Sequence, residues 1–184
     1  MNYKAYLQLM RPKHYLKNIL IFVPLIFSGY LFTDDYLVRS IFSFLAFSMV
    51  ASAVYIFNDI IDKEYDKKHP TKKNRPIAAG KVSVRAAIIL LVALLGLATV
   101  FQSFAGFTAA GVGLLAFYLA INIGYSLGLK HLPVIDVAIL SLGFVVRVLY
   151  GGYSVDIEIS MWLYLAILAV SFYLGLGKRR NEIR

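Results

Sequence analysis

Residues 36–66 read YLVRSIFSFLAFSMVASAVYIFNDIIDKEYD, an apolar stretch that runs directly into a group of acidic residues. The segment Tyr36–Phe57 is almost free of charge, and it is long enough to cross a bilayer, which takes about 20 mainly apolar residues. Asp59, Asp62 and Asp66 follow it at once. Carboxylates at the edge of a membrane are costly and are usually functional. The segment therefore predicts a membrane helix that ends in a functional acidic site.

The rest of the chain has the same apolar character. Hydrophobic residues make up 60% of its 184 residues, and the mean hydropathy is +0.72, whereas soluble domains average about 45–50% apolar residues. We therefore expect an all-α fold, a polytopic transmembrane helical bundle of about six spans in a single transmembrane domain over 1–184. The five further runs with almost no charge are 19–32, 86–104, 107–121, 137–150 and 161–176.

Positive charges collect in the segments that six spans would place on one side of the membrane. Lys and Arg concentrate before the first span, in Lys63–Arg85 and after the sixth span, whereas the opposite loops carry acids such as Asp35 and Asp156. Because Lys and Arg favour the cytoplasmic side, we expect both termini and an active-site loop around 58–85 to be cytoplasmic, at a bacterial-type inner membrane. This topology also explains the net charge of +9 without a nucleic-acid partner.

The acidic residues are spaced so that a helix would bring them to one face. Asp62 and Asp66 lie close to one and two turns after Asp59. Three like charges on one face need a compensating cation, and carboxylate oxygens suit Mg²⁺, which takes one or two carboxylates together with water and substrate phosphates. We expect Asn58, Asp59, Asp62 and Asp66 to hold the metal, with the three aspartates as catalytic residues. The alternative is a solvated helix end whose acids pair with nearby lysines.

A basic loop follows the acidic residues. From His69 to Lys81 it reads HPTKKNRPIAAGK, in which two prolines and a glycine break the helix and four cations are spread along the loop. A metal on one side and arginine or lysine on the other can clamp a phosphate or diphosphate group. Beside the aspartates the loop therefore predicts phosphate binding, whereas alone it would reflect membrane topology.

Two charged residues accompany the predicted fifth span. Asp136 and Arg147 are about three helical turns apart and therefore share a face. A charged residue in a membrane helix usually faces the interior of the bundle. We expect both to line a polar cavity, and the alternative is interior pairing with the backbone or with a polar group such as Asn122.

Together these motifs resemble the UbiA-type intramembrane prenyltransferase superfamily. Residues 58–66 and 74–80 are similar to its first aspartate-rich motif, NDxxDxxxD, and to the following loop, NRPIAAG. Further segments are similar to the branch that contains decaprenyl-phosphate phosphoribosyltransferase. They are LMRPKHYLKN (9–18), YSLGLK (125–130) with Asp136, GFVVR (143–147) and GKRRNE (177–182).

The resemblance implies an enzyme whose active site opens to the cytoplasmic side and uses Mg²⁺ as cofactor. In that branch a phosphoribosyl group passes from phosphoribosyl diphosphate to a polyprenyl phosphate, with release of diphosphate, often for cell-envelope biosynthesis. The aspartate motif would hold the metal and the diphosphate. The substrate-binding residues that we expect are Arg11, Lys13, Lys17, Asn18, Asn58, Arg75, Tyr125, Lys130, Asp136, Arg147, Lys178 and Arg179.

The superfamily fold usually has nine spans, and this sequence holds six of them. We therefore expect an incomplete nine-span UbiA-type fold. Three explanations stand side by side: a fragment, a naturally short gene product, or a chain that completes its bundle by association as an oligomer.

Two other functions stay open. An aromatic prenyltransferase would move an isoprenoid from its diphosphate to an aromatic acceptor with the same metal motif, but it would need an apolar groove and an aromatic-binding pocket. The cations of 11–17 favour two phosphorylated substrates instead. A non-catalytic membrane subunit or transporter would not need Asp59 and Asp62.

Overall fold

The computed structural model describes residues 3–129 and 133–182. Within these ranges the chain is helical and contains no strand. The elements, in chain order, are α1 (Tyr3–Met10), the 3₁₀ helix η1 (Pro12–Phe22), α2 (Val23–Ser28), α3 (Asp34–Ile61), α4 (Lys63–Lys68), the short 3₁₀ helix η2 (Lys72–Asn74), α5 (Val84–Ala105), α6 (Ala109–Leu127), α7 (Pro133–Tyr153) and α8 (Met161–Glu182).

The six predicted spans fall on helical elements of this structure. The first covers the end of η1 and all of α2, and the others fall on α3, α5, α6, α7 and α8. The prediction of an all-α helical bundle is confirmed. Shorter apolar stretches occupy Ala138–Tyr153 of α7 and Met161–Tyr173 of α8. Among the described residues, three helices are long and apolar enough to cross a membrane by themselves: Asp35–Ile61, Val84–Ala105 and Ala109–Leu127.

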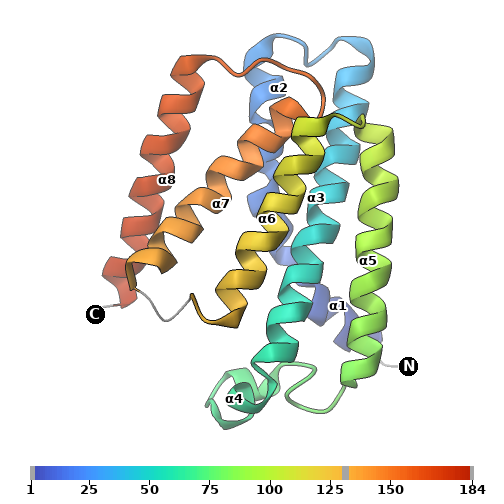
Figure 1. The fold of residues 1–184 in the computed structure, drawn as a ribbon, viewed down its shortest axis with the longest axis vertical. Helices are drawn as coiled ribbons and strands as arrows, with labels where there is room; N and C mark the ends of the chain where they lie inside the picture. Colours follow the sequence, from blue (N-terminus) through green and yellow to red (C-terminus); the bar gives the residue numbers. More distant parts are fainter. Residues whose placement is uncertain (1–2, 130–132, 183–184) are drawn as a thin grey trace.

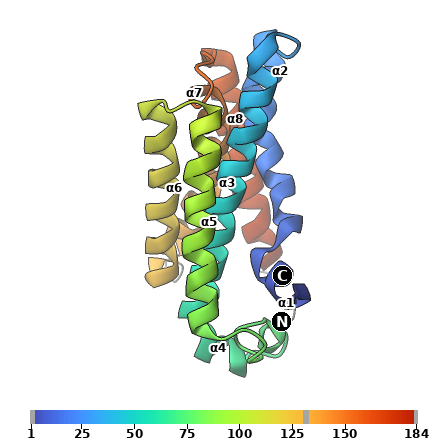
Figure 2. The same ribbon diagram turned by 90° about the vertical axis from the view of Figure 1, so that its right-hand side faces the viewer.

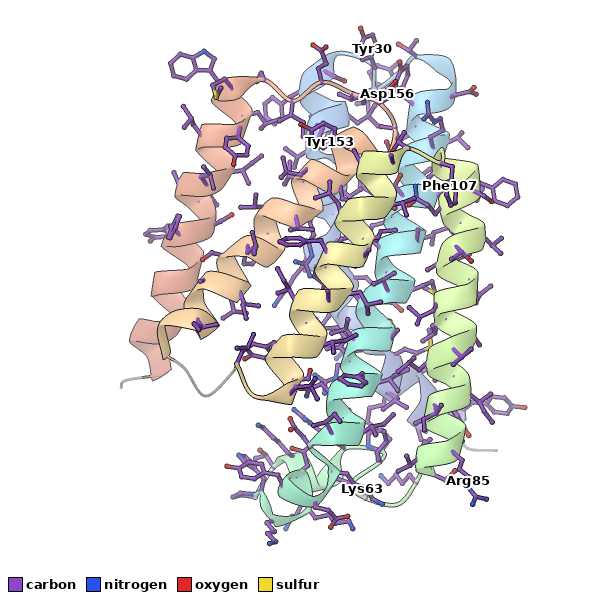
Figure 3. The ribbon with its side chains drawn as sticks, in the orientation of Figure 1. Tyr30, Lys63, Arg85, Phe107, Tyr153 and Asp156 are labelled. Carbon is purple, nitrogen blue, oxygen red and sulfur yellow. The ribbon has the colours of Figure 1, made fainter. Side chains whose placement is uncertain are left out.

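The central helix of the bundle is α3. In its most apolar stretch 67% of the residues are buried inside the protein, against 17% in α5 and in α6. The long helices lie side by side, with α5 at one edge and α8 at the other (Figure 1), and η1 with α2 lies on the side away from α6 (Figure 2). Large apolar side chains project outward along the outer helices (Figure 3). Such a surface is suited to lipid.

One end of the bundle gathers the charged segments. The elements α1, α4 and η2 lie there, and α8 runs toward that end (Figure 1). Lys63 and Arg85 mark this end in Figure 3, whereas Tyr30 and Asp156 mark the other. We call the end marked by Lys63 and Arg85 the acidic end, because α3 reaches it at Asp59. Because α1 lies at this end and α8 runs toward it, the arrangement agrees with the even number of spans predicted from the sequence.

The element η1 is an unusually long 3₁₀ helix, with 11 residues where three or four are common. Three residues per turn align side chains that are three positions apart. Tyr15, Asn18 and Ile21 therefore share one face. Tyr15 Oη lies 2.7 Å from Ser52 Oγ, and Asn18 Nδ2 donates to Ser48 Oγ at 3.0 Å. The apolar pattern of the first span did not indicate this 3₁₀ geometry.

The packing of η1 against α7 is close enough to require a glycine. A Cβ atom on Gly151 would overlap the carbonyl oxygen of Ile21, which is itself fully buried. Helix α7 can therefore approach the backbone of η1 at this point only because Gly151 has no side chain. This contact helps to set the position of Arg147, one turn earlier on α7.

Candidate functional site

Two buried aspartates and two arginines form a cluster at the acidic end. Asp59 Oδ1 accepts hydrogen bonds from Arg11 Nη2 at 2.6 Å and from Arg75 Nη1 at 3.1 Å. The same Arg75 atom donates to Asp66 Oδ2 at 2.7 Å. Both carboxylates are almost fully buried, with exposed side-chain fractions of 2% and 1%. We call Arg11, Asp59, Asp66 and Arg75 the aspartate–arginine cluster.

The spacing of the aspartates predicted one helical face, and Asp59 and Asp66 do contact the same arginine. The helix itself is interrupted at Asp62. Helix α3 ends at Ile61 and α4 begins at Lys63, with Asp62 between them in a non-helical conformation. Its Oδ2 accepts a hydrogen bond from Asn58 Nδ2 at 3.2 Å. Helical backbone hydrogen bonds continue across this point, from Asp62 N to the Asn58 carbonyl oxygen and from Asp66 N to the Asp62 carbonyl oxygen. Asp59 and Asp66 therefore still reach the same guanidinium.

The two buried aspartates of the cluster do not pair with nearby lysines, which was the alternative considered from the sequence. Lys67 Nζ lies 2.8 Å from Glu64 Oε1, an exposed acid of the same segment. Asp59 and Asp66 pair with arginines from distant parts of the chain instead. The acidic residues that end α3 are therefore organised by tertiary contacts.

Arg11 reaches the cluster through a strained turn. Its backbone lies in the left-handed region, at φ 54° and ψ 55°, which is uncommon for a residue other than glycine. The following Pro12 restricts this residue further. The turn separates α1 from η1 and directs the guanidinium of Arg11 over the ring of Tyr55, 5.0 Å from its centroid. Such strain persists where surrounding contacts enforce it, often at functional sites.

The predicted metal ligands offer suitable oxygen atoms but do not form a closed cage. Asp66 Oδ1 is buried and has no hydrogen-bond partner. Among the described residues, no three acidic, histidine or cysteine side chains converge to hold a metal ion by themselves. Mg²⁺ commonly takes one or two carboxylates and completes its shell with water and substrate phosphates. The residues present therefore fit Mg²⁺ bound with a phosphate ligand, and the metal site stays a prediction.

Arg147 is the centre of a second, interior polar group. Its Nε donates to Asn18 Oδ1 at 2.9 Å, its Nη1 to the Gly143 carbonyl oxygen at 2.5 Å, and its Nη2 to Tyr118 Oη at 3.3 Å. The guanidinium carbon also lies 5.2 Å from the centroid of the Phe47 ring. Among the described residues, no carboxylate lies within ion-pair distance of Arg147. Asn122, the partner considered from sequence, bonds to the carbonyl oxygen of Tyr118 instead.

A cavity of about 160 Å³ lies beside Arg147. We call it the polar cavity. Tyr55 connects it to the aspartate–arginine cluster, because its ring contacts Arg11 and also lines the cavity. The polar residues of the wall are Lys17, Tyr55, Tyr118, Asn122, Tyr125 and Arg147.

His14 lies between the two sites. Its ring meets the ring of Tyr55 edge-on at a centroid distance of 5.0 Å. Burial, followed by the positive charges of Arg11 and Lys17, lowers the pKa of His14 below its ordinary value. The side chain is therefore neutral at pH 7.

The structure brings together most of the predicted site residues, in two groups. Arg11, Asn58 and Arg75 lie with the aspartates, and Lys17, Asn18, Tyr125 and Arg147 lie in or behind the wall of the polar cavity. Lys13 is exposed and does not line that cavity. Lys130 lies outside the described residues. The side chains of Asp136 on α7 and of Lys178 and Arg179 on α8 lie outside the described part of the structure as well.

Two aromatic residues of the site were missed in the sequence. Tyr55 and Tyr118 contact the functional arginines and line the polar cavity. Each lies one helical turn before a polar residue of the site, namely Asp59 and Asn122. Aromatic hydroxyls at this spacing would have been a usable signal.

Helical bundling, an outward apolar surface and a charged end define a multi-pass membrane protein. The chain belongs to the UbiA prenyltransferase family, which matches residues 21–176. The resemblance predicted from the sequence is confirmed.

Two of the relatives with curated names share one name. The chain is 38% identical over 176 residues to decaprenyl-phosphate phosphoribosyltransferase from Corynebacterium glutamicum, covering 95% of this chain and 53% of that protein. It is 37% identical over 179 residues to the protein of the same name from Mycolicibacterium smegmatis, covering 95% and 56%. The chain therefore spans about half the length of these relatives.

Solved structures share the fold. A digeranylgeranylglyceryl phosphate synthase superposes with a TM-score of 0.78 at 21% identity, covering 96% of this chain and 60% of that one. A UbiA homologue from Archaeoglobus fulgidus bound to DMAPP and Mg²⁺ gives a TM-score of 0.75 at 22% identity, covering 91% and 60%. At such low identity the likeness establishes the fold alone.

Proposed function

We propose that this chain carries the site of a Mg²⁺-dependent transferase, which moves a phosphoribosyl group from phosphoribosyl diphosphate to a polyprenyl phosphate and releases diphosphate. The observation that carries the proposal is the aspartate–arginine cluster, in which Arg75 bridges the buried carboxylates of Asp59 and Asp66. The relatives named decaprenyl-phosphate phosphoribosyltransferase support the transferred group and the acceptor.

The cluster supplies both signs of charge that a diphosphate donor needs. Asn58, Asp59, Asp62 and Asp66 would hold Mg²⁺, which when bound offsets the negative charge that develops on the leaving diphosphate. Arg11 and Arg75 can donate charge-assisted hydrogen bonds to diphosphate oxygens, the geometry for which the guanidinium is suited. Their bonds to the aspartates keep these two cations beside the metal ligands before the donor arrives.

The proposed reaction needs positioning more than proton transfer. The bond between ribose C1 and a diphosphate oxygen breaks, and its electron pair leaves with the diphosphate. An oxygen of the lipid phosphate forms the new bond to C1. Because this phosphate is already an anion, no general base is required, and holding both reactants in place supplies much of the acceleration. A neutral His14 is consistent with this requirement.

We also propose that the acidic end faces the cytoplasm at an inner membrane, with 58–85 forming the entrance to a site in one domain. The concentration of Lys and Arg at this end supports that orientation. The chain has no cysteine, so single cysteines can report on it. In intact cells a membrane-impermeant maleimide should label Asp156→Cys and spare Lys68→Cys. Labelling of Lys68→Cys instead of Asp156→Cys would show that the acidic end faces away from the cytoplasm.

A substrate-pair assay tests the proposed reaction. The chain in detergent is given labelled phosphoribosyl diphosphate with polyprenyl phosphate, and in parallel prenyl diphosphate with an aromatic acid. We expect label in the lipid only with the first pair and only with Mg²⁺. Asp59→Asn should lower this rate by about 100-fold or more, the usual effect of losing one charge-stabilising group.

Glu64→Gln is the matched control, because Glu64 is an exposed acid of the same segment whose ion pairs are with lysines. It should retain the wild-type rate. Product from the second pair alone would instead support an aromatic prenyltransferase. No product from either pair, with Asp59→Asn indistinguishable from wild type, would support a non-catalytic membrane subunit or transporter.

A further inference from the structure

Arg147 is a buried cation that the aspartate–arginine cluster does not contact. Its guanidinium is bonded to an amide oxygen, a carbonyl oxygen and a phenol oxygen, all of them neutral. The described part of the chain offers it no carboxylate within ion-pair distance. Charges within membrane helices normally have a partner or serve a ligand. An anion in the polar cavity would supply a negative charge that the described residues do not.

Lys17 strengthens this expectation from another element. It lines the polar cavity from η1, whereas Arg147 lines it from α7. The volume of about 160 Å³ is below the roughly 300–1,000 Å³ of sites for drug-sized ligands. The polar cavity therefore suits one phosphate group better than a whole sugar diphosphate.

An apolar groove of about 270 Å³ lies along the seam between η1, α7 and α8, next to the polar cavity. Phe144 belongs to the walls of both. Leu20 of the groove lies one 3₁₀ turn after Lys17 of the cavity, so the two side chains share a face of η1. On the far side the groove is closed by α8, including Ala166. A cationic cavity beside an apolar groove, with one aromatic wall in common, matches an amphiphile with an anionic head.

We propose that the polar cavity and the apolar groove together bind a lipid monophosphate, with its phosphate between Lys17 and Arg147 and its hydrocarbon chain along η1, α2, α7 and α8. The groove extends to Phe27 of α2 and Leu163 of α8, elements that lead away from the acidic end (Figure 1). The chain of the lipid would thus run along the bundle, within the depth of the membrane.

The inference rests on the proposed function, since it assigns the acceptor to a subsite of its own. Tyr55 separates that subsite from the donor cluster, contacting Arg11 and lining the polar cavity. The two phosphate-bearing substrates would therefore meet on either side of one aromatic ring.

Binding of farnesyl monophosphate to the purified chain in detergent tests the inference. Titration calorimetry without Mg²⁺ and without donor measures its affinity, beside inorganic phosphate and farnesol as the separate head and chain. We expect farnesyl monophosphate to bind more tightly than either. Lys17→Gln should weaken both phosphate ligands about tenfold, the loss expected for a charged hydrogen bond. Lys17 is exposed, so this substitution leaves the core intact.

A substitution in the apolar groove tests the contribution of the hydrocarbon chain to binding separately from that of the phosphate. Ala166→Trp fills the apolar groove and should weaken farnesyl monophosphate about tenfold, while inorganic phosphate stays within about twofold. Ala116→Trp is the matched control, because Ala116 is an equally exposed alanine in another apolar groove, between α5 and α6. Arg85→Gln controls for the loss of an exposed cation. Neither control should change the affinity.

Several outcomes would overturn the inference. Farnesol binding as tightly as farnesyl monophosphate would mean hydrophobic partition, and inorganic phosphate binding as tightly would mean a free-phosphate site. An unchanged affinity in Lys17→Gln would show that the phosphate does not bind beside Lys17. An unchanged affinity in Ala166→Trp would show that the hydrocarbon chain does not lie in the apolar groove. A change of oligomeric state in Ala166→Trp, seen by light scattering, would make the groove an interface between copies. Lipid binding as expected without phosphoribosyl transfer would instead overturn the proposed function and leave the lipid site standing.

Discussion

Arg75 Nη1 lies 2.7 Å from Asp66 Oδ2, a contact that ties the basic loop to the acidic segment it follows. The same atom also reaches Asp59, so one guanidinium holds together two carboxylates that would otherwise repel each other. The loop therefore closes over the end of α3 even without substrate. The groups that we propose to bind phosphate and metal are already assembled in one place.

Arg75→Gln should destabilise the fold because it leaves Asp59 and Asp66 buried without their shared cation. Breaking a buried ion pair by removing one partner costs about 3–5 kcal/mol. Thermal unfolding in detergent should show a lower Tm than wild type. Added Mg²⁺ should recover part of the loss, because the metal can neutralise the same carboxylates. Lys81→Gln, an exposed cation of the same loop, should leave Tm unchanged, and equal Tm values for both variants would contradict the bridge.

Asn18→Leu should destabilise the fold, because Arg147 loses its hydrogen-bond partner from η1. The substitution removes the acceptor of Arg147 Nε and the donor to Ser48. Hydrogen bonds to charged groups contribute about 1.5–3 kcal/mol, so the free energy of unfolding should fall by that amount. Asn18→Asp keeps an acceptor oxygen and adds a charge partner for Arg147, and it should retain most of the stability. Equal losses in both variants would mean that packing alone explains the role of Asn18.

Gly151→Ala should be strongly destabilising, because its Cβ would overlap the carbonyl oxygen of Ile21. Forcing a methyl group into a packed contact costs about 1–3 kcal/mol or more. Gly113→Ala is the matched control on α6, where a Cβ meets nothing within 4 Å and where alanine favours the helix by about 1 kcal/mol. Thermal unfolding of the two variants should shift in opposite directions. A Gly151→Ala protein as stable as wild type would show that η1 can move away from α7.

His14 should make stability depend on pH in the mildly acidic range. Because its pKa is lowered in the folded protein, the folded state favours the neutral ring. Its contribution is complete above the ordinary pKa of about 6.5 and is lost as the pH falls through the lowered value. Tm should therefore drop between pH 7 and pH 5 by more in wild type than in His14→Gln. Parallel curves for the two proteins would exclude this role.

Much of the architecture was readable from the sequence because hydrophobicity is a local property. Long apolar runs predicted the helices of the bundle, and charge placement predicted which ends lie together. The aspartate and basic-loop motifs predicted where charged groups would gather. The interruption at Asp62 was missed, because residues 58–66 contain no proline or glycine that would mark a break in the helix. The 3₁₀ geometry of η1 was missed as well, since it depends on packing against α3 and α7.

The sequence by itself therefore determined the membrane helices, their parity and the chemical character of the acidic end. Only the tertiary structure decided which charges meet: Arg11 with Asp59, 48 residues apart, and Arg147 with Asn18, 129 residues apart. The physical reason is that propensity and apolar periodicity act over a few residues, whereas a buried charge selects its partner by three-dimensional proximity. The polar cavity exists because η1, α3, α6 and α7 pack together, and the apolar groove because η1, α2, α7 and α8 do. No single segment contains either.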